Sequence, residues 1–356
     1  MTQRISYLDG HRGLAILMVL FYHAYARWPE LLPYSDRYKL FFASGILGVQ
    51  LFFLLSGFVI LMTLETCPRP REFIRKRWLR LFPGMLICSV VLFATASLFP
   101  ERPAGMPDVL SLLPGVLFIE PEWIGALINQ PVAPLEGAFW SLYVEFKFYI
   151  MAAVLYFSYG RARLVFALIV LSIAGILCQW LAEISMHPVA QTLKVIADGL
   201  SLRHFGWFAA GAAAYIYTRA QDRRWLAIAG LCAAYSAIAF QFGYWKITAA
   251  ALAISSFFIL SICSPMVRRL LDNRVLLFFG FISYPLYLSH ENVMVASIIQ
   301  LGDSGIMQGA AFLYPCVPVA GLILFSYWCA RQGEPLLKKW LAAALSVRSR
   351  SAPSTS

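Results

Sequence analysis

The chain is poor in charge and carries no cysteine pattern typical of a metal site. Charged residues make up 13% of its 356 residues, against about 25% in soluble domains. The seven cysteines form no Cys-x-x-Cys pair and no cluster with histidine, so we expect neither a zinc site nor a disulfide framework. Hydrophobic residues make up 60% and the mean hydropathy is +0.70. This composition excludes a surface that water solvates throughout, and it predicts an all-α integral membrane protein.

The sequence also lacks an internal repeat and a cleavable signal peptide. Its first apolar run ends in His23, Tyr25 and Arg27 without a small-residue cleavage site, so we expect this run to be retained as a membrane span. Apolar runs punctuated by charge predict about ten transmembrane helices in one domain, residues 1–345, followed by a disordered cytoplasmic tail, residues 346–356. The predicted spans are 12–31, 41–64, 81–99, 138–157, 164–182, 204–218, 226–242, 247–264, 276–297 and 310–330.

Lys and Arg are distributed unequally between the two sets of loops. If residues 1–12 are cytoplasmic, the loops on that side hold 21 Lys and Arg residues and the opposite loops hold 7. Cytoplasmic loops carry an excess of basic residues, so this bias predicts both termini inside. It also accounts for the net charge of +11 without a nucleic-acid partner. The longest outer loop, 100–137, is acidic, and it is either a lid over the outer mouth or a plain acidic loop.

Two ionisable residues share a face of the first predicted helix. Arg12 and His23 are eleven residues apart, which is about 20° beyond three full turns and about 16 Å along the axis. Arg12 is then expected near the inner headgroups and His23 about halfway into the membrane. Burial there favours the neutral imidazole, which is the form a general base requires. The alternative is a histidine that makes a purely structural hydrogen bond, and the arginine on the same face counts against it.

Glu145 and His290 are expected at about the same depth as His23. A carboxylate at this depth either orients the imidazole and stabilises the imidazolium, or pairs with a basic residue for packing. Lys147 is only two residues from Glu145 and points to another face, so it is not the expected partner. His290 either lines the acceptor side of a pocket or caps the helix near the break at Pro285.

The cytoplasmic loop before the third span is strongly basic. Within it, Arg77 and Arg80 are three residues apart and share a helix face. Arginine suits bidentate contacts with phosphate groups. Anionic lipid headgroups would explain the same charges, so both interpretations stay open.

Together these segments resemble acyltransferase family 3, a family of membrane proteins. The resemblance runs over nearly the whole chain, from LDGHRGLAILMVLFYH through GVQLFFLLSGFVI to ISYPLYLSH. The residues that carry it are Arg12 and His23; Arg77 and Arg80; Trp140, Ser141 and Glu145; and Ser283, Tyr284, Tyr287 and His290. The chain departs from the family pattern at Gln50, where an acidic residue is frequent, and at Phe146 and Lys147, where a Glu-Gln pair is frequent. These departures affect the expected acceptor pocket.

The resemblance implies about ten helices around a cavity, and transfer of an acyl group to a hydroxyl of a sugar or another envelope or secreted molecule. The donor would be acetyl-CoA or another acyl-CoA, reacting directly or through an acyl-histidine. The expected location is the bacterial inner membrane, among its lipids. The implied site residues are His23 and Glu145 for catalysis, Arg12, Arg77 and Arg80 for the donor, and Trp140, Ser141 and His290 for the acceptor.

A transporter or flippase for a glycan or a lipid-linked substrate is the alternative function. Charged residues near the membrane midplane and helix breakers are also typical of carriers. Carriers usually consist of repeated halves, which this sequence lacks.

Overall fold

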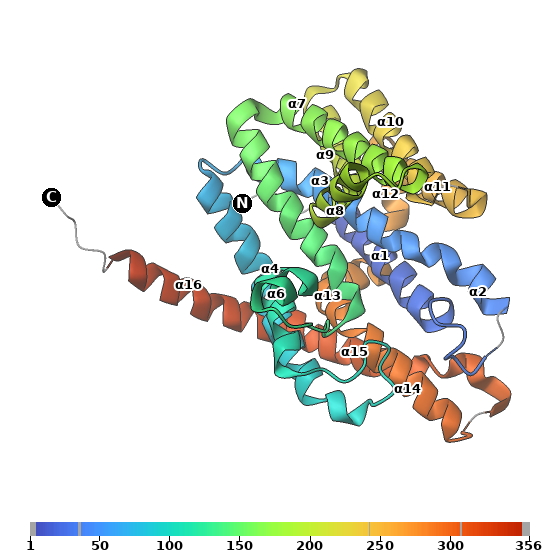
Figure 1. Cartoon of the computed structure of the whole chain (residues 1–356). Helices are drawn as coiled ribbons and strands as arrows, with labels where there is room; N and C mark the ends of the chain where they lie inside the picture. The colour runs from blue at the N-terminus through green and yellow to red at the C-terminus, as the bar shows by residue number, and fades with distance from the viewer. Residues whose placement is uncertain (1–4, 35–36, 242, 307, 351–356) are drawn as a thin grey trace. The chain divides into compact units, whose positions relative to one another are not determined.

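The computed structural model describes residues 5–34, 37–241, 243–306 and 308–350 (Figure 1). Every regular element in these ranges is a helix, which confirms the all-α prediction for this part of the chain. The chain forms two compact units. Unit 1 is Met1–Tyr22, Phe41–Ile74 and Ser141–Gly280, and unit 2 is His23–Leu40, Arg75–Trp140 and Phe281–Ser356.

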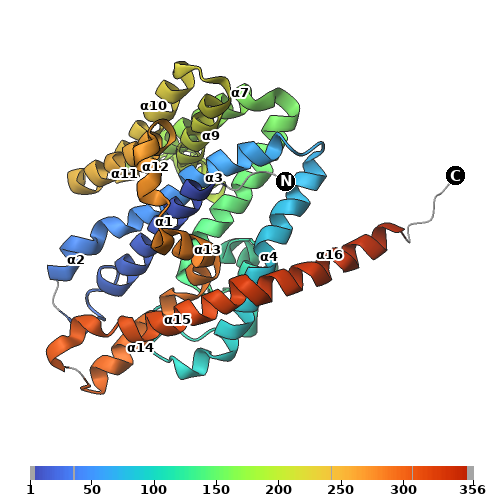
Figure 2. The same ribbon diagram turned by 180° about the vertical axis from the view of Figure 1, so that it is seen from behind.

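Four helices form the core of unit 1, each packed on the next in the order α3, α9, α10 and α11 (Figures 1 and 2). Their bounds are Gly48–Leu64 for α3, Phe205–Ala220 for α9, Arg223–Phe240 for α10 and Trp245–Cys263 for α11. The shorter helices of this unit are η1 (Ala43–Leu47), α8 (Pro188–Gly199), η5 (Leu202–His204) and α12 (Pro265–Leu271).

The backbones of α3 and α9 touch at two glycines. A Cβ added to Gly57 would lie 2.0 Å from the carbonyl oxygen of Phe208, and one added to Gly211 would lie 1.9 Å from that of Leu54. Helices in membranes associate through such small-residue contacts, because lipid supplies no hydrophobic drive between them. The close crossing of these two helices therefore depends on glycine at both positions.

Four further helices have residues in both units. α7 (Trp140–Ile184) contains two predicted spans, and its backbone leaves the helical conformation between them at Gly160, where φ is 80° and ψ is 177°. α1 (Ser6–Tyr25), α4 (Pro70–Ala94) and α13 (Arg274–Ser289) each contribute residues to both units.

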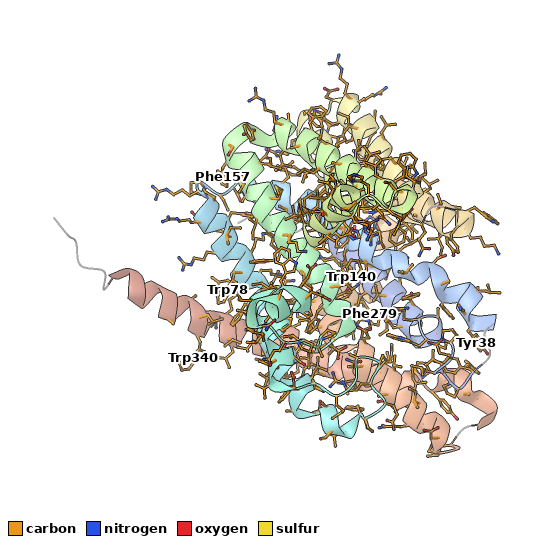
Figure 3. All side chains as sticks on the ribbon, in the orientation of Figure 1. Tyr38, Trp78, Trp140, Phe157, Phe279 and Trp340 are labelled. Atoms are coloured by element: carbon orange, nitrogen blue, oxygen red, sulfur yellow. The ribbon has the colours of Figure 1, made fainter. Side chains whose placement is uncertain are left out.

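In unit 2, α14 and α15 lie side by side (Figures 1 and 2). α15 continues through a π-helical turn into α16, whose Trp340 is exposed (Figure 3). α16 carries the helix five residues into the segment predicted to be a disordered tail, and residues 351–356 lie outside the described part. The α-helices that lie wholly in unit 2 are α5 (Leu112–Leu117), α6 (Pro121–Ile128), α14 (Glu291–Asp303), α15 (Cys316–Trp328) and α16 (Glu334–Arg350). The short elements are α2 (Arg37–Phe42), η2 (Ala96–Leu98), η3 (Val109–Ser111), η4 (Gly137–Phe139), η6 (Gln308–Leu313) and the π turn (Cys329–Gly333).

Fewer helices than predicted are long enough to cross a membrane. In the described residues, five qualify by length and composition: Tyr38–Leu64, Pro70–Ala94, Gly137–Ile184, Trp245–Cys263 and Ala310–Ala344. Counting the pair Val109–Leu117 and Pro121–Ile128, bent by 120°, as one span gives six. By this measure the prediction of about ten is too high. Part of the difference is that Gly137–Ile184 counts once, although its backbone leaves the helical conformation at Gly160, between two predicted spans. In addition, α9, α13 and α14 have 16, 16 and 13 residues, short of the roughly 20 that a span needs.

Candidate active site

Two histidines that are distant in the sequence meet in unit 2. His23 lies in the last turn of α1, and His290 lies at the break between α13 and α14. Nδ1 of His23 is 3.3 Å from Nε2 of His290, and the ring centroids are 4.7 Å apart with the planes nearly perpendicular. His290 is fully buried. The structure thus brings together a predicted catalytic residue and a residue predicted to lie near the acceptor.

The second nitrogen of His290 fixes the direction of this hydrogen bond. Nδ1 of His290 is 2.9 Å from the carbonyl oxygen of Tyr287. A carbonyl only accepts, so His290 carries its proton on Nδ1, and in neutral His290 the Nε2 atom is an acceptor. Nδ1–H of His23 must then donate to it, which leaves Nε2 of neutral His23 unprotonated. The chain of bonds from Tyr287 to His290 to His23 therefore selects the His23 tautomer that can accept a proton at Nε2.

Side-chain hydrogen bonds satisfy backbone carbonyls on the α13 side of the break at His290. Pro285 lies within α13, and the Ser289 hydroxyl donates to the Pro285 carbonyl at 2.9 Å. α13 ends at Ser289, and His290 bonds a carbonyl of its last turn, as the capping interpretation of this histidine expects. The same ring contacts His23 through its other nitrogen, so the cap and the contact are not exclusive.

Residues to which the sequence assigned no role hold the start of α14. The carboxylate of Glu291 accepts a hydrogen bond from the backbone N–H of Ala138. The backbone N–H of Asn292 donates to Glu136 at 3.1 Å. A Cβ on Gly137 would lie 2.7 Å from Glu291, so a larger residue there would displace this carboxylate. The end of the predicted outer loop is therefore bonded to the two residues that follow His290.

A second set of hydrogen bonds connects the predicted outer loop, residues 100–137, to the start of α14. The Asn292 side chain donates to the carbonyl of Leu135 at 3.0 Å and accepts from the N–H of Ala104 at 3.1 Å, and Arg102 donates to Leu135 at 2.7 Å. Loop 100–137 contains helices and is anchored at both of its ends, so it is not a plain acidic loop. Only its acidic composition was visible in the sequence, and that did not single out these residues.

A buried carboxyl group lies within this anchor, outside the candidate spans. Glu136 is 1% exposed, and its Oε1 atom has no hydrogen-bond partner among the described residues. Burial and the nearby charge of Glu291 raise the pKa of Glu136 well above the ordinary value. Burial also lowers the pKa of Arg102, whereas the negative charge of Glu136 acts to raise it.

Glu145 belongs to unit 1, on α7. Its Oε1 atom accepts hydrogen bonds from the hydroxyls of Ser56 and Tyr149, each at 2.6 Å. Lys147 instead donates to the carbonyl of Gly199 at 2.6 Å, so the two residues have separate partners, as their spacing predicts. Because the predicted partner His23 is in unit 2, the action of Glu145 on that histidine stays a prediction.

The three arginines predicted to bind the donor lie on α1 and α4. α1 is unbroken from residue 6 to 25, so Arg12 and His23 share one helix as predicted. Arg12 is about one-third exposed and forms an ion pair with Asp9 at 2.9 Å. Arg80 lies 3.7 Å from Glu334, with its guanidinium 5.2 Å above a tyrosine ring, and Arg77 is half-buried on the same helix.

The residues predicted for the acceptor differ in exposure. Trp140, at the start of α7, is 40% exposed (Figure 3), whereas Ser141 is buried. Gln50, at a departure from the family pattern, is also buried. Among the described residues, no group of three or more His, Cys, Asp or Glu side chains is arranged to hold a metal ion.

The sequence is similar to a known protein family and to several known enzymes. Residues 5–331 match the acyltransferase domain, the model of acyltransferase family 3. The chain is 25% identical over 178 residues to an O-acetyl transferase of Shigella phage Sf6, covering 47% of this chain and 51% of that protein. It is 29% identical over 157 residues to O-acetyltransferase OatA of Staphylococcus aureus (strain NCTC 8325 / PS 47), covering 40% and 23%.

A third relative has a more specific name. The peptidoglycan O-acetyltransferase OatA of Listeria monocytogenes is 27% identical over 161 residues, covering 40% of this chain and 23% of that protein. These alignments span about half of the phage protein and less than a quarter of the OatA proteins. No solved structure matches the chain significantly.

Proposed function

Because this chain belongs to acyltransferase family 3, we propose that it is a membrane-embedded O-acetyltransferase. It moves an acetyl group from cytoplasmic acetyl-CoA to a hydroxyl of a sugar or another envelope or secreted acceptor. The O-acetyltransferase names of its relatives support the reaction, and the peptidoglycan name of one relative supports a carbohydrate acceptor. The Lys/Arg bias of the loops supports a multi-pass protein of the bacterial inner membrane with both termini inside.

The contact between His23 and His290 is the observation that carries this proposal. O-acylation needs a group that removes the acceptor's hydroxyl proton as the oxygen attacks. The hydrogen bonds from Tyr287 through His290 leave Nε2 of His23 unprotonated and able to do this.

The reaction proceeds with His23 as general base. Nε2 of His23 takes the hydroxyl proton while the acceptor oxygen bonds to the thioester carbonyl carbon. The carbon–sulfur bond then breaks, and the imidazolium returns the proton to the leaving thiolate, so that free CoA and the acetyl ester form. Glu145, held by Ser56 and Tyr149, stabilises the imidazolium by its negative charge.

The donor is bound through its phosphates by Arg12, Arg77 and Arg80. Two of these arginines already have carboxylate partners, Asp9 and Glu334. Part-exposed ion pairs of this kind are worth about 1 kcal/mol or less, so a phosphate group can replace the carboxylate. On the acceptor side, the exposed ring of Trp140 stacks on the sugar, and the neighbouring Ser141, which is buried, contributes a hydroxyl.

Release of free CoA tests the proposal. Purified protein in nanodiscs is given acetyl-CoA and candidate acceptors, with wild type beside His23→Ala. We expect CoA release that depends on both the acceptor and His23. Acceptor-independent hydrolysis, or equal rates in the two proteins, would reject the mechanism. In a parallel assay with the protein in sealed proteoliposomes, movement of a glycan across the membrane without acetyl-CoA would instead indicate a carrier.

A further inference from the structure

Unit 1 contains a cavity of about 800 Å³ whose lining includes none of the residues assigned to the proposed chemistry. Its walls come from the start of α1, the end of α3, the end of α9 and the connection from α11 to α12. All four segments lie at the ends of predicted spans on the side with the Lys/Arg excess. The volume falls in the range that small-molecule and cofactor sites occupy, about 300–1,000 Å³.

Two arginines give this cavity a positive charge. Arg219 and Arg268 line it, and Glu65 is the one acidic residue among the described lining residues. Both oxygens of Glu65 are already engaged: Arg161 lies 3.2 Å from Oε1, and the Tyr215 hydroxyl donates to Oε2 at 2.7 Å. Glu65 is thus committed to other partners, and the cavity favours an anion.

Arg268 is held rigidly in the wall. Its Nε donates to the carbonyl of Ser261 at 2.8 Å, and its Nη2 donates to the carbonyl of Ile262. Its guanidinium lies 5.2 Å above the ring of Tyr7. A guanidinium fixed on one edge binds an anion with its remaining N–H groups without losing further side-chain freedom.

The size of the cavity, its aromatic walls and its two arginines specify a ligand class. Tyr7 and Tyr217 supply flat surfaces, and Arg219 and Arg268 supply charge. We propose that this cavity binds a phosphate-bearing ligand from the cytoplasmic side, with the phosphate on the two arginines. The phosphate is either the 3′-phosphate of CoA, whose diphosphate the proposed function assigns to Arg12, Arg77 and Arg80, or that of an anionic lipid headgroup; the first source rests on the proposed function.

Binding to purified protein tests this without any turnover. The protein in nonionic detergent is titrated calorimetrically with adenosine 3′,5′-bisphosphate and, separately, with short-chain phosphatidylglycerol. Arg219→Gln is the informative variant, because Arg219 is exposed, whereas Arg268 also supports the end of α11. Arg223→Gln is the matched control, since Arg223 is an exposed arginine at the start of α10 that does not line the cavity.

We expect Arg219→Gln to weaken binding about tenfold, as for the loss of one hydrogen bond to a charged group, while Arg223→Gln binds like wild type. This pattern with the bisphosphate identifies a nucleotide source, and the same pattern with phosphatidylglycerol alone identifies a lipid. Absence of binding by both probes, or equal affinity in all three proteins, would overturn the proposal. Because no acceptor is present, failure of CoA release would reject the proposed function and leave this site standing.

Discussion

The role of His290 yields the sharpest prediction. Replacing it with leucine removes the acceptor of the Nδ1–H of His23, a bond of 3.3 Å in a fully buried place. A buried group left without its hydrogen bond costs about 1–3 kcal/mol. At about 1.36 kcal/mol for each factor of ten, the population of the reactive His23 tautomer, and with it kcat, should fall by roughly 5- to 150-fold.

His290→Gln is the matched variant. The carbonyl oxygen of glutamine can accept the same Nδ1–H, so this protein should keep kcat within a few-fold of wild type. KM for acetyl-CoA should be unchanged in both variants, because the bond acts on the base and not on the donor. CoA release gives kcat and KM, and ¹⁵N NMR of histidine-labelled protein reports the tautomer directly.

Two results would refute this reasoning. One is a leucine variant with wild-type kcat. The other is equal loss in the glutamine and leucine variants while both melt like wild type, because a tautomer effect must distinguish a side chain that accepts a hydrogen bond from one that does not. A change in KM alone would assign His290 to acceptor binding, as the sequence first suggested.

Three further predictions concern packing, pH and the donor. Gly211→Val should destabilise the protein by about 1–3 kcal/mol, since its Cβ would meet a carbonyl oxygen of α3 at 1.9 Å; Gly230→Val on α10, where a Cβ meets nothing within 4 Å, should lower the melting temperature much less. The raised pKa of Glu136 means that the folded state binds more protons than the unfolded state, so the free energy of unfolding should fall as pH rises above the ordinary glutamate range. Glu136→Gln should flatten this fall when melting temperatures are measured over a pH series. An unchanged slope in the variant would contradict the role given to Glu136. Arg80→Gln should raise KM for acetyl-CoA about tenfold at constant kcat, unlike Arg75→Gln in the same basic segment.

The sequence predicts how residues of one helix lie relative to each other, but it does not predict the side-chain contacts between two helices. Arg12 and His23 share a helix because helical periodicity fixes their spacing, and α1 is continuous between them. The contact of His23 with His290 spans 267 positions, and only their similar expected depth pointed to it. Glu136 could not be found, because its role depends on a bond to the backbone of Asn292, which leaves no pattern in composition.

The excess of predicted spans has a related physical cause. Hydropathy measures the length of an apolar run and does not register where the backbone changes direction. At Gly160 the backbone of α7 leaves the helical conformation between two predicted spans, and the run 276–297 is divided at His290. The conformation at Gly160 is one that glycine permits but does not require, whereas His290 keeps helical φ and ψ angles, so no residue type in the run marks this division.

The division at His290 links the fold to the proposed chemistry. A helix broken at membrane depth leaves backbone groups that lipid cannot satisfy. Here the side chains of Ser289 and His290 bond carbonyls before the break, and Glu136 accepts from the backbone N–H of Asn292 after it. The bond that satisfies the Tyr287 carbonyl is the same one that fixes the proton of His290 and hence the tautomer of His23. A continuous helix through residue 290 would satisfy the Tyr287 carbonyl within its own backbone. His290 would then lose the hydrogen bond that fixes the tautomer of His23, even if every residue of the site were retained.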